Sequence, residues 1–395
     1  MQQFKDELSR ELDNILSFWI KNMVDEDSDG FHGRITGKGF LDKKAPRGLV
    51  LNARICRTFS AAYSFSGNEL YRSIAERSLQ YIITHFYDAE HGGFYWSVDA
   101  EGKPLETKKQ TYGQAFCCYA FSDFYRATGK DEAREWAIRV FHWIEQYSFD
   151  DKSPGYIEGL SRDWKSLDDL RLSDKDENEV KTTNTHLHLL EAYTSLYLIH
   201  KDPLLEKRLR SLLYLFDEVI PDPVTGHLRL FFDEEWRAKG NMISYGHEIE
   251  TSWLMVEAAA ALGEQNLMQR IKKRSLDLAR ISQEGLDGDG GLWHEYKNGK
   301  LVREKHWWTQ AEAMVGFFNA RQLSADESFL KQSQLSWDFI RKHLIDHIGG
   351  EWHWGVKDSY ELMIDQDKAG FWKCPYHNSR ACMEMIRRIG NSLTS

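Results

Sequence analysis

The 395-residue sequence lacks several features that would place it in a common class of protein. Its five cysteines are an odd number without CxxC spacing, which indicates neither a disulfide framework nor a zinc site. No apolar run approaches the roughly 18 residues that a membrane helix needs, and the charged N-terminus has no apolar signal core. A net charge of −10 without a basic tract argues against a nucleic-acid partner. These absences predict a cytoplasmic protein with neither a membrane nor a nucleic-acid partner.

Aromatic residues, in contrast, are abundant. They make up 13% of the chain and include 14 tryptophans. Such rings build packed helix interfaces, and they also stack on the faces of sugars. We expect packing to account for most of them.

A short sequence pattern recurs every 60 to 70 residues or so. It consists of a glycine, then aromatic residues and an alternating, strand-like stretch, and often a turn. Several instances, such as DAEGKP and YKNGKL, carry the Gly/Asn chemistry of short β-hairpins. The instances begin near Gly30, Gly92, Gly155, Gly226, Gly290 and Gly349.

Two kinds of helical pattern alternate between these points. Amphipathic patterns, typical of surface helices, cover 2–22, 68–87, 130–149, 203–220, 264–281 and 326–345. Patterns that are apolar nearly all round, typical of buried helices, cover 47–66, 110–129, 182–201, 244–263, 306–324 and 372–390. Six outer and six inner helices predict an all-α fold, an (α/α)6 barrel with short β-hairpins at one end, as a single domain over residues 1–395. A two-domain helical array is the alternative, but the regularity of the repeat favours the closed ring.

Polar residues in buried helices are the informative exceptions. Here they cluster in the first two turns of the inner helices, which in an alternating barrel all open at the same end. That end is the candidate active site. The residues are Asn52, Arg54, Tyr112, Gln114, Asn184, His186, His188, His247, Glu250, Trp308, Gln310, Glu312, Tyr376, His377, Asn378 and Arg380.

Several alternatives remain for these residues. Each histidine could be a hydrogen-bonded structural group, and Arg54 or Arg380 could pair with Glu250 or Glu312. The i,i+3 pairs in HLLE and HEIE could bind a metal, but the sequence has no HExxH motif and no Cys/His cluster, which favours a site without metal. A glycosidase would use paired carboxylates, for which Glu250, Glu312 and the acidic run 174–179 are available. A non-enzymatic sugar-binding barrel is a further possibility.

Histidines dominate the expected mouth of the barrel and favour another chemistry. A neutral imidazole accepts a proton near pH 7, and the positive end of a helix dipole helps to keep it neutral. Arg54 would stabilise a negative oxygen. Two such bases on opposite faces of a planar intermediate would permit epimerisation next to a carbonyl without a cofactor.

At these residues the chain resembles the N-acylglucosamine 2-epimerase superfamily, and most closely its cellobiose 2-epimerase branch. The motifs are LNARI (51–55), KTTNTHLHLLEAYT (181–194), SYGHEIETSWL (244–254), WWTQAEAMVGFFNA (307–320) and WKCPYHNSRACMEMI (372–386). The resemblance implies a metal-free mechanism through ring opening and a cis-enediolate. It assigns His247 and His377 as the acid/base pair, His188 either to ring opening or to the oxygens of the intermediate, and Arg54 to those oxygens. The residues implied to position the sugar are Tyr112, Asn184, Glu250, Trp308, Glu312 and Trp372.

One departure from the family pattern bears on the substrate. Three residues after Arg54 the family leads us to expect an aromatic residue, but this chain has Arg57. Hydrogen-bond donors in place of a stacking platform favour a single sugar, so we expect epimerisation of free mannose and glucose. The alternatives are a cellobiose 2-epimerase and a mannose isomerase, and Arg57 could also simply pair with a carboxylate. We expect a small-molecule sugar as the partner, a monomer or homodimer, and a structural role for His186, which points away from His188.

Overall fold

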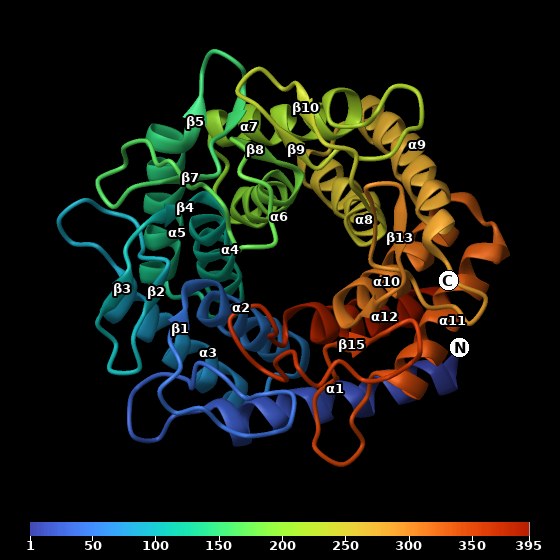
Figure 1. Cartoon of the computed structure of the whole chain (residues 1–395), viewed down its shortest axis with the longest axis horizontal. Coiled ribbons are helices and arrows are strands. Elements are labelled where there is room, and N and C mark those ends of the chain that lie inside the picture. The colour runs from blue at the N-terminus through green and yellow to red at the C-terminus, as the bar shows by residue number, and fades with distance from the viewer. Residues whose placement is uncertain (395) are drawn as a thin grey trace.

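The structure is a computed structural model that describes residues 1–394, and the side chains of residues 1–391. Within these residues, twelve α-helices alternate between two concentric rings (Figure 1). The outer ring holds α1 (Gln2–Met23), α3 (Glu69–Tyr81), α5 (Asp131–Trp143), α7 (Pro203–Tyr214), α9 (Gln265–Ile281) and α11 (Glu327–His343). The inner ring holds α2 (Leu49–Ser66), α4 (Thr111–Thr128), α6 (Thr183–Ile199), α8 (Tyr245–Leu262), α10 (Trp307–Ser324) and α12 (Tyr376–Thr394). The predicted (α/α)6 barrel is confirmed.

The two rings differ in how much of each helix is buried. Outer helix α9 buries one face, through residues such as Ile271 and Leu278, whereas inner helix α6 is buried along most of its length. This contrast follows from the sequence, because an amphipathic helix needs one apolar neighbour and an all-apolar helix needs neighbours on every side. No helix in residues 1–394 is long and apolar enough to cross a membrane.

The predicted helix ends differ from the observed ones in two ways. Helices α3, α5 and α7 each pass into a π turn, at Ile82–Phe86, Ile144–Ser148 and Leu215–Val219. One turn of π-helix changes the hydrophobic period too little to show in the sequence. The last inner helix begins at Tyr376 rather than at 372, because the residue before Pro375 is restricted to extended conformations.

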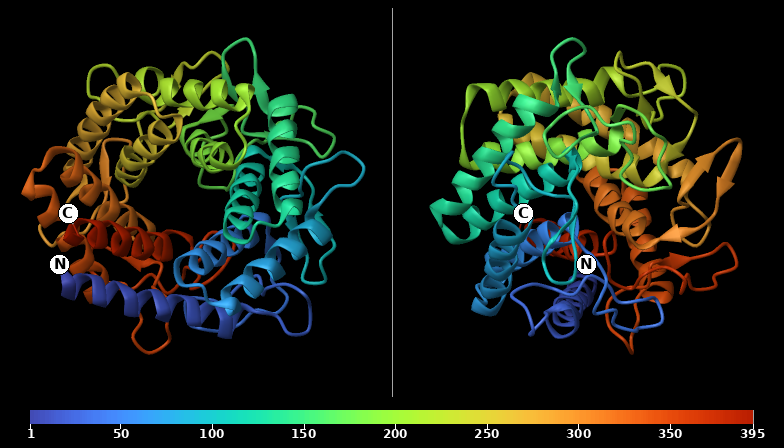
Figure 2. Two further views of the ribbon diagram at one scale, coloured as in Figure 1. Left: turned by 180° about the vertical axis from the view of Figure 1, so that it is seen from behind. Right: turned by 60° about the vertical axis from the view of Figure 1, so that its left-hand side comes forward.

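Short strands gather at one end of the barrel, as the views in Figure 2 show. They form the antiparallel sheets β1-β2-β3, β4-β7, β5-β6, β8-β9-β10, β11-β12-β13 and β14-β15. Most inner helices are preceded by a two-residue strand that pairs with a strand of the next repeat, so the sheets connect neighbouring repeats. The strands are β1 (Arg47–Gly48), β2 (Ser97–Val98), β3 (Pro104–Glu106), β4 (Lys109–Gln110), β5 (Phe149–Asp150), β6 (Gly155–Tyr156), β7 (Gly159–Leu160), β8 (Lys181–Thr182), β9 (Phe231–Phe232), β10 (Ala238–Lys239), β11 (Ile243–Ser244), β12 (Glu295–Lys297), β13 (Lys300–Val302), β14 (Lys305–His306) and β15 (Gly355–Val356).

An ion pair with a buried lysine or arginine anchors the turn at this end in four of the repeats. In the second repeat, Asp88 accepts hydrogen bonds from the backbone N–H groups of Glu90 and His91, and its other oxygen lies 3.1 Å from the Nζ of Lys109. Lys109 stands two residues before its inner helix, and both charged groups are fully buried. The corresponding pairs are Arg47 with Asp25, Lys181 with Asp150, and Lys305 with Asp287, at 2.6, 2.8 and 2.7 Å. We call these four pairs the turn anchors.

Candidate active site

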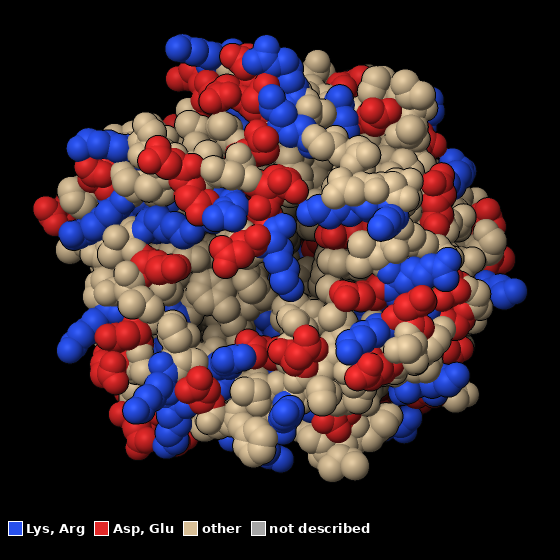
Figure 3. All heavy atoms as spheres, viewed as in Figure 1, with Lys and Arg blue, Asp and Glu red and all other residues tan. Residues whose placement is uncertain are grey.

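A cleft of about 550 Å³ opens at the strand end of the barrel, where the N-termini of the inner helices converge. Figure 3 shows this face of the molecule hollowed near its centre, with charged side chains of both signs around the hollow. Most of the residues expected from the sequence lie together in its lining. They are Arg54, Tyr112, Asn184, His188, His247, Glu250, Trp308, Trp372 and His377.

His377 lies in the first turn of α12 and is held from behind by a carboxylate. Its Nδ1 lies 2.7 Å from Oε1 of Glu312, and Oε2 of Glu312 accepts a hydrogen bond of 3.0 Å from the indole of Trp253. Because a carboxylate only accepts, Nδ1 of His377 carries the hydrogen, and Nε2 keeps a free lone pair. Burial lowers the pKa of His377 well below its usual range, and Arg54 and Arg380 add to this effect.

His188 is held in the same way from α6. Its Nδ1 lies 3.3 Å from Oε2 of Glu191, and its ring packs edge-on against Tyr112 with centroids 5.0 Å apart. Burial lowers the pKa of His188 to about 4, although Glu191 opposes this shift. His188 is therefore neutral at pH 7.

His247 has a less restrictive partner. Its Nδ1 lies 2.8 Å from the hydroxyl of Ser244, which can donate or accept, so either ring nitrogen of His247 can carry the hydrogen. Burial lowers its pKa to about 3. The indole of Trp308 packs against the rings of both His247 and His377, with centroid distances of 4.9 and 5.7 Å. Two neutral imidazoles thus pack against one aromatic ring in the cleft.

Arg54 supplies a cation among aromatic rings. One of its terminal nitrogens donates to the hydroxyl of Tyr112 at 2.7 Å, and its guanidinium lies 4.3 Å from the ring centroid of Phe116. The side chain is buried, and its Nε has no hydrogen-bond partner. A buried cation in the lining of the cleft is suited to stabilise an oxygen that becomes negative during a reaction.

Three ligand-type groups lie close enough to suggest a metal site: one atom each of Glu250, Glu312 and His377 lies within 4.8 Å of the others. The two carboxylates, however, already share a cation, since Nη2 of Arg380 lies 2.6 Å from Glu250 and 2.7 Å from Glu312. Burial and the neighbouring charge of Glu312 raise the pKa of Glu250 well above its usual range. This donor set fits an ion-pair network.

Two predicted sugar-binding residues do not line the cleft. Glu312 lies behind His377 and uses both of its oxygens within the protein. Arg57 pairs with Asp123 at 3.1 Å, and its guanidinium lies 5.0 Å from the ring centroid of Tyr119. Arg57 thus forms the carboxylate pair that was the alternative, and it is not among the residues that line the cleft.

Several of the other polar residues of the inner helices have structural partners. His186 accepts a hydrogen bond of 2.9 Å from the backbone N–H of Tyr156, and its Nδ1 lies 2.7 Å from the carbonyl oxygen of Thr182. Both ring nitrogens are therefore satisfied, which confirms its structural role. Gln114 and Gln310 hold the preceding hairpins through hydrogen bonds to the backbones of Phe94 and Leu292.

The rim of the cleft contains residues that the sequence analysis did not select. His294 and His306 stack with ring centroids 3.9 Å apart, and Nε2 of His306 lies 2.9 Å from Glu304. Trp354 and the loop around Lys175 complete this side of the rim. These rim residues belong to the aromatic hairpin repeats and to the acidic run 174–179. From the sequence, the repeats were interpreted only as turns between helices, and the acidic run only as a source of candidate carboxylates.

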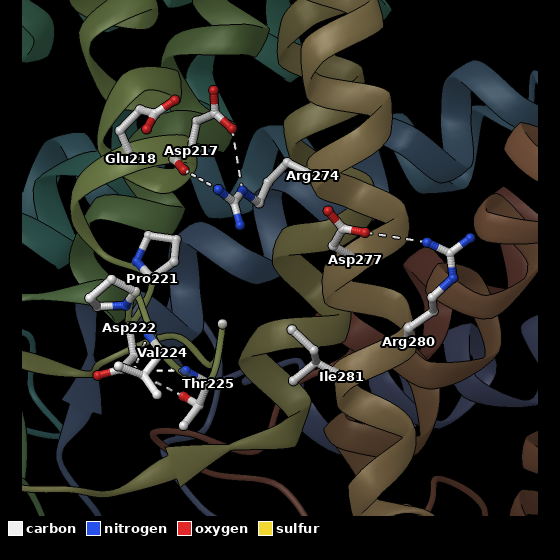
Figure 4. A pocket seen from close by; sticks show the side chains of 12 residues that line it. Asp217, Glu218, Pro221, Asp222, Val224, Thr225, Arg274, Asp277, Arg280 and Ile281 are labelled. Atoms are coloured by element: carbon white, nitrogen blue, oxygen red, sulfur yellow. Dashed lines mark hydrogen bonds and ion pairs between the residues drawn. The ribbon is translucent and has the colours of Figure 1, made fainter.

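A second cleft, of about 540 Å³, lies on the outer surface between α9 and the turn at Pro221–Gly226 (Figure 4). Four of its charged side chains form two ion pairs: Arg274 with Asp217 at 3.3 Å, and Arg280 with Asp277 at 3.3 Å. It contains no histidine among its lining residues, so it offers no group comparable to those of the first cleft.

The fold and the first cleft together define a helical-barrel enzyme of the carbohydrate-active type. The family model for N-acylglucosamine 2-epimerase (GlcNAc 2-epimerase) matches residues 30–381. A cellobiose 2-epimerase of Bacteroides fragilis is 48% identical over 97% of this chain and 98% of its own length. The structure of a cellobiose 2-epimerase from Bacillus thermoamylovorans superposes with a TM-score of 0.94 at 36% identity, covering 98% of this chain and all of the other. A D-mannose isomerase of Marinomonas mediterranea is 23% identical over 97% of both chains.

The chain belongs to the N-acylglucosamine 2-epimerase family. It is a carbohydrate epimerase, an isomerase by class of reaction.

Proposed function

We propose that the protein inverts C2 of the reducing-end glucose of cellobiose and similar β-1,4-disaccharides, and that residues 1–395 act as a single catalytic domain. The observation that carries the proposal is that His247 and His377 both line one cleft and both pack against the ring of Trp308. Both imidazoles are neutral at pH 7, so either one can take a proton from carbon.

The reaction follows from this geometry. His188 assists opening of the sugar ring, which exposes the C1 carbonyl. One histidine of the pair removes the C2 proton, and Arg54 stabilises the oxygens of the resulting cis-enediolate. Rotation about C2–C3 presents the other face, and the second histidine of the pair delivers to it a proton taken up from solvent, while the first histidine releases the C2 proton to solvent. The net change is inversion at C2, with no gain or loss of electrons.

Three observations favour a disaccharide over a free monosaccharide. A cleft of about 550 Å³ has more room than a hexose of twelve heavy atoms fills. Its rim carries Trp354, Phe371 and Trp372, whose rings can stack on a second sugar. The sequence argument for a single sugar depended on Arg57, which lies outside the cleft lining. The relatives at 36 to 48% identity described above are named cellobiose 2-epimerases.

The test is incubation with cellobiose, glucose and mannose separately in D2O, with NMR of the products. We expect β-1,4-glucosylmannose with deuterium at C2, formed with a higher kcat/KM than mannose from glucose. Faster turnover of the free sugars would restore the monosaccharide hypothesis. A ketose as the main product would indicate a mannose-isomerase type of reaction, and released glucose would indicate a glycosidase.

We also propose that the enzyme works in the cytoplasm. All five cysteines are free and buried, which suits a reducing compartment. The expectation of a monomer or homodimer is open to measurement by light scattering.

A further inference from the structure

A layer of buried charge lies directly beneath the cleft, centred on Arg380. Its side chain is 2% exposed, and its Nη2 bonds to Glu250 and Glu312 at 2.6 and 2.7 Å. Its Nη1 bonds to Glu191 and lies 2.5 Å from the hydroxyl of Tyr376. These three carboxylates stand on α6, α8 and α10, so one guanidinium from α12 joins four of the six inner helices.

Two of the three carboxylates have a histidine as a further partner. Glu312 holds Nδ1 of His377 at 2.7 Å, and Glu191 holds Nδ1 of His188 at 3.3 Å. An ionised carboxylate can only accept, so both histidines carry their hydrogen on Nδ1. The bare Nε2 of each ring, on the side away from its carboxylate, is the atom left for the cleft.

We propose that Arg380 is a positioning residue that sets the tautomer of His188 and His377 through the carboxylates of Glu191 and Glu312. The inference rests on the proposed function, in which the Nε2 atoms exchange protons with the sugar. Arg380 itself is not among the residues that line the cleft.

The physical reason is the charge of the carboxylates. Burial raises the pKa values of Glu250 and Glu312, and the charge of Arg380 opposes this shift, as it does for Glu191. Without the shared cation, the hydrogen-bonded Glu191 and Glu312 would therefore take up protons at a higher pH. A protonated carboxyl donates through its O–H, so it would give a hydrogen to Nδ1 of its histidine and move the imidazole hydrogen to Nε2. A histidine with hydrogen on Nε2 cannot take a proton from C2. Lysine cannot replace Arg380 fully, because one ammonium lacks the planar fork that reaches Glu191 on one side and Glu312 on the other.

The experiment compares R380A, R380K and the control R387A with the wild-type enzyme. Arg387 belongs to the same helix, but its side chain is 54% exposed and pairs with Glu384 near the opposite end of the barrel. Each protein is assayed for kcat and KM on cellobiose, and its ¹⁵N-labelled histidine rings are observed by NMR without substrate. Guanidinium chloride at millimolar concentration is added to R380A as a chemical replacement for the missing group.

We expect R380A to lose kcat by roughly 10²- to 10⁴-fold with KM little changed, and guanidinium to restore part of it. The ring signals of two histidines should change from the Nδ1–H to the Nε2–H form, those of R380K should be intermediate, and R387A should match the wild type. A folded R380A with normal kcat, with a change in KM alone, or with unchanged ring signals would overturn the proposal.

R380A leaves three buried carboxylates without their cation and can fail to fold, so E191Q and E312Q provide a second route. Each keeps the shape of its side chain and removes one branch of the network. E191Q should change the ring signal of His188 alone, and E312Q that of His377 alone; unchanged signals in both variants contradict the proposal. Because the NMR measurement needs no substrate, it remains decisive if the wild-type enzyme proves to catalyse a different reaction.

Discussion

The two ends of the barrel both bury charged residues among the inner helices, yet they differ in what those residues leave unsatisfied. At the far end, Asp123 accepts hydrogen bonds from Arg57 at 3.1 Å and from Ser195 at 2.6 Å, which leaves only a donor, Nη1 of Arg57, without a partner in this group. At the strand end, His188 and His377 are held through Nδ1 and keep Nε2 for the cleft.

The comparison shows that buried polarity alone does not mark an active site. What distinguishes the strand end is a set of side chains fixed by the protein on one side and open to a ligand on the other. Such one-sided support keeps a reactive group in place at no cost of reorganisation during the reaction. Four changes would test or sharpen this contrast.

The largest effect on activity should come from the histidines that face the cleft at the strand end. Replacing His247 or His377 with alanine should lower kcat by roughly 10²- to 10⁴-fold each, because each removes a proton-transfer group. Thermal unfolding should remain cooperative in both variants. Steady-state kinetics on cellobiose would measure the loss, and near-normal turnover by either variant would contradict the two-base mechanism.

A large effect on stability should come from a turn anchor, which lies at the same end but does no chemistry. D88N removes the charge opposite Lys109, and both groups are fully buried at 3.1 Å. An uncompensated buried charge costs about 3–5 kcal/mol of unfolding free energy, measurable by urea denaturation. The matched control is D27N, whose partner Lys43 lies 3.4 Å away at the exposed surface, and which should change nothing measurable.

An intermediate effect should appear in acid through His186, the histidine that is closed on both sides. Its pKa is about 4 in the folded protein and 6.5 otherwise. The unfolded chain therefore binds the extra proton first, so stability is full above pH 6.5 and declines as the pH falls towards 4. One histidine accounts for about 3 kcal/mol of this decline, at 1.36 kcal/mol per pKa unit.

The stability of H186Q should therefore depend less on pH than that of the wild type in urea titrations between pH 7 and pH 4.5. The exposed His347 provides the control, since H347Q should keep the wild-type pH dependence. Equal slopes for all three proteins would show that His186 is not buried in its neutral form.

The smallest effect should come from the far end. R57L removes one partner of Asp123, which keeps Arg126 at 3.1 Å, so we expect a loss of about 1–3 kcal/mol of stability. Its kcat/KM for cellobiose should equal that of the wild type. R57F introduces the aromatic residue expected in the family, and a changed ratio of cellobiose to mannose turnover in that variant would return Arg57 to the substrate site.

The fold could be predicted from the sequence because the two rings demand different hydrophobic patterns, and those patterns repeat. The histidines could be predicted because polar residues in the first turns of apolar helices have no structural reason to recur at one end. The sequence could not predict how far along the barrel axis a side chain lies from the cleft. Arg57 shares a helix face with Arg54 but lies three residues further from the N-terminus, about 4.5 Å along the axis, and this is enough to place it outside the cleft lining.

The rim and the turn anchors were also missed, for different reasons. His294 and His306 come from hairpin segments that meet only after the repeats close into a ring, and their contact leaves no local pattern. The turn anchors do leave one: a lysine or arginine two residues before an inner helix, at 47, 109, 181 and 305. A buried cation is unusual enough that this position should be searched for in other barrels of this kind.

Because of the turn anchors, the stability of the barrel depends little on which residues form the rim of the cleft. In the second repeat, Asp88 and Lys109 bond to each other, and Asp88 also bonds to residues 90, 91 and 162, none of which lies in the tip of the β2–β3 hairpin at residues 99–103. That tip can therefore be lengthened, shortened or exchanged without breaking the anchor beneath it. New sugar preferences can then arise by exchange of one hairpin at a time while the histidines at the base of the cleft stay unchanged. This applies to a natural lineage and to a library built for that purpose.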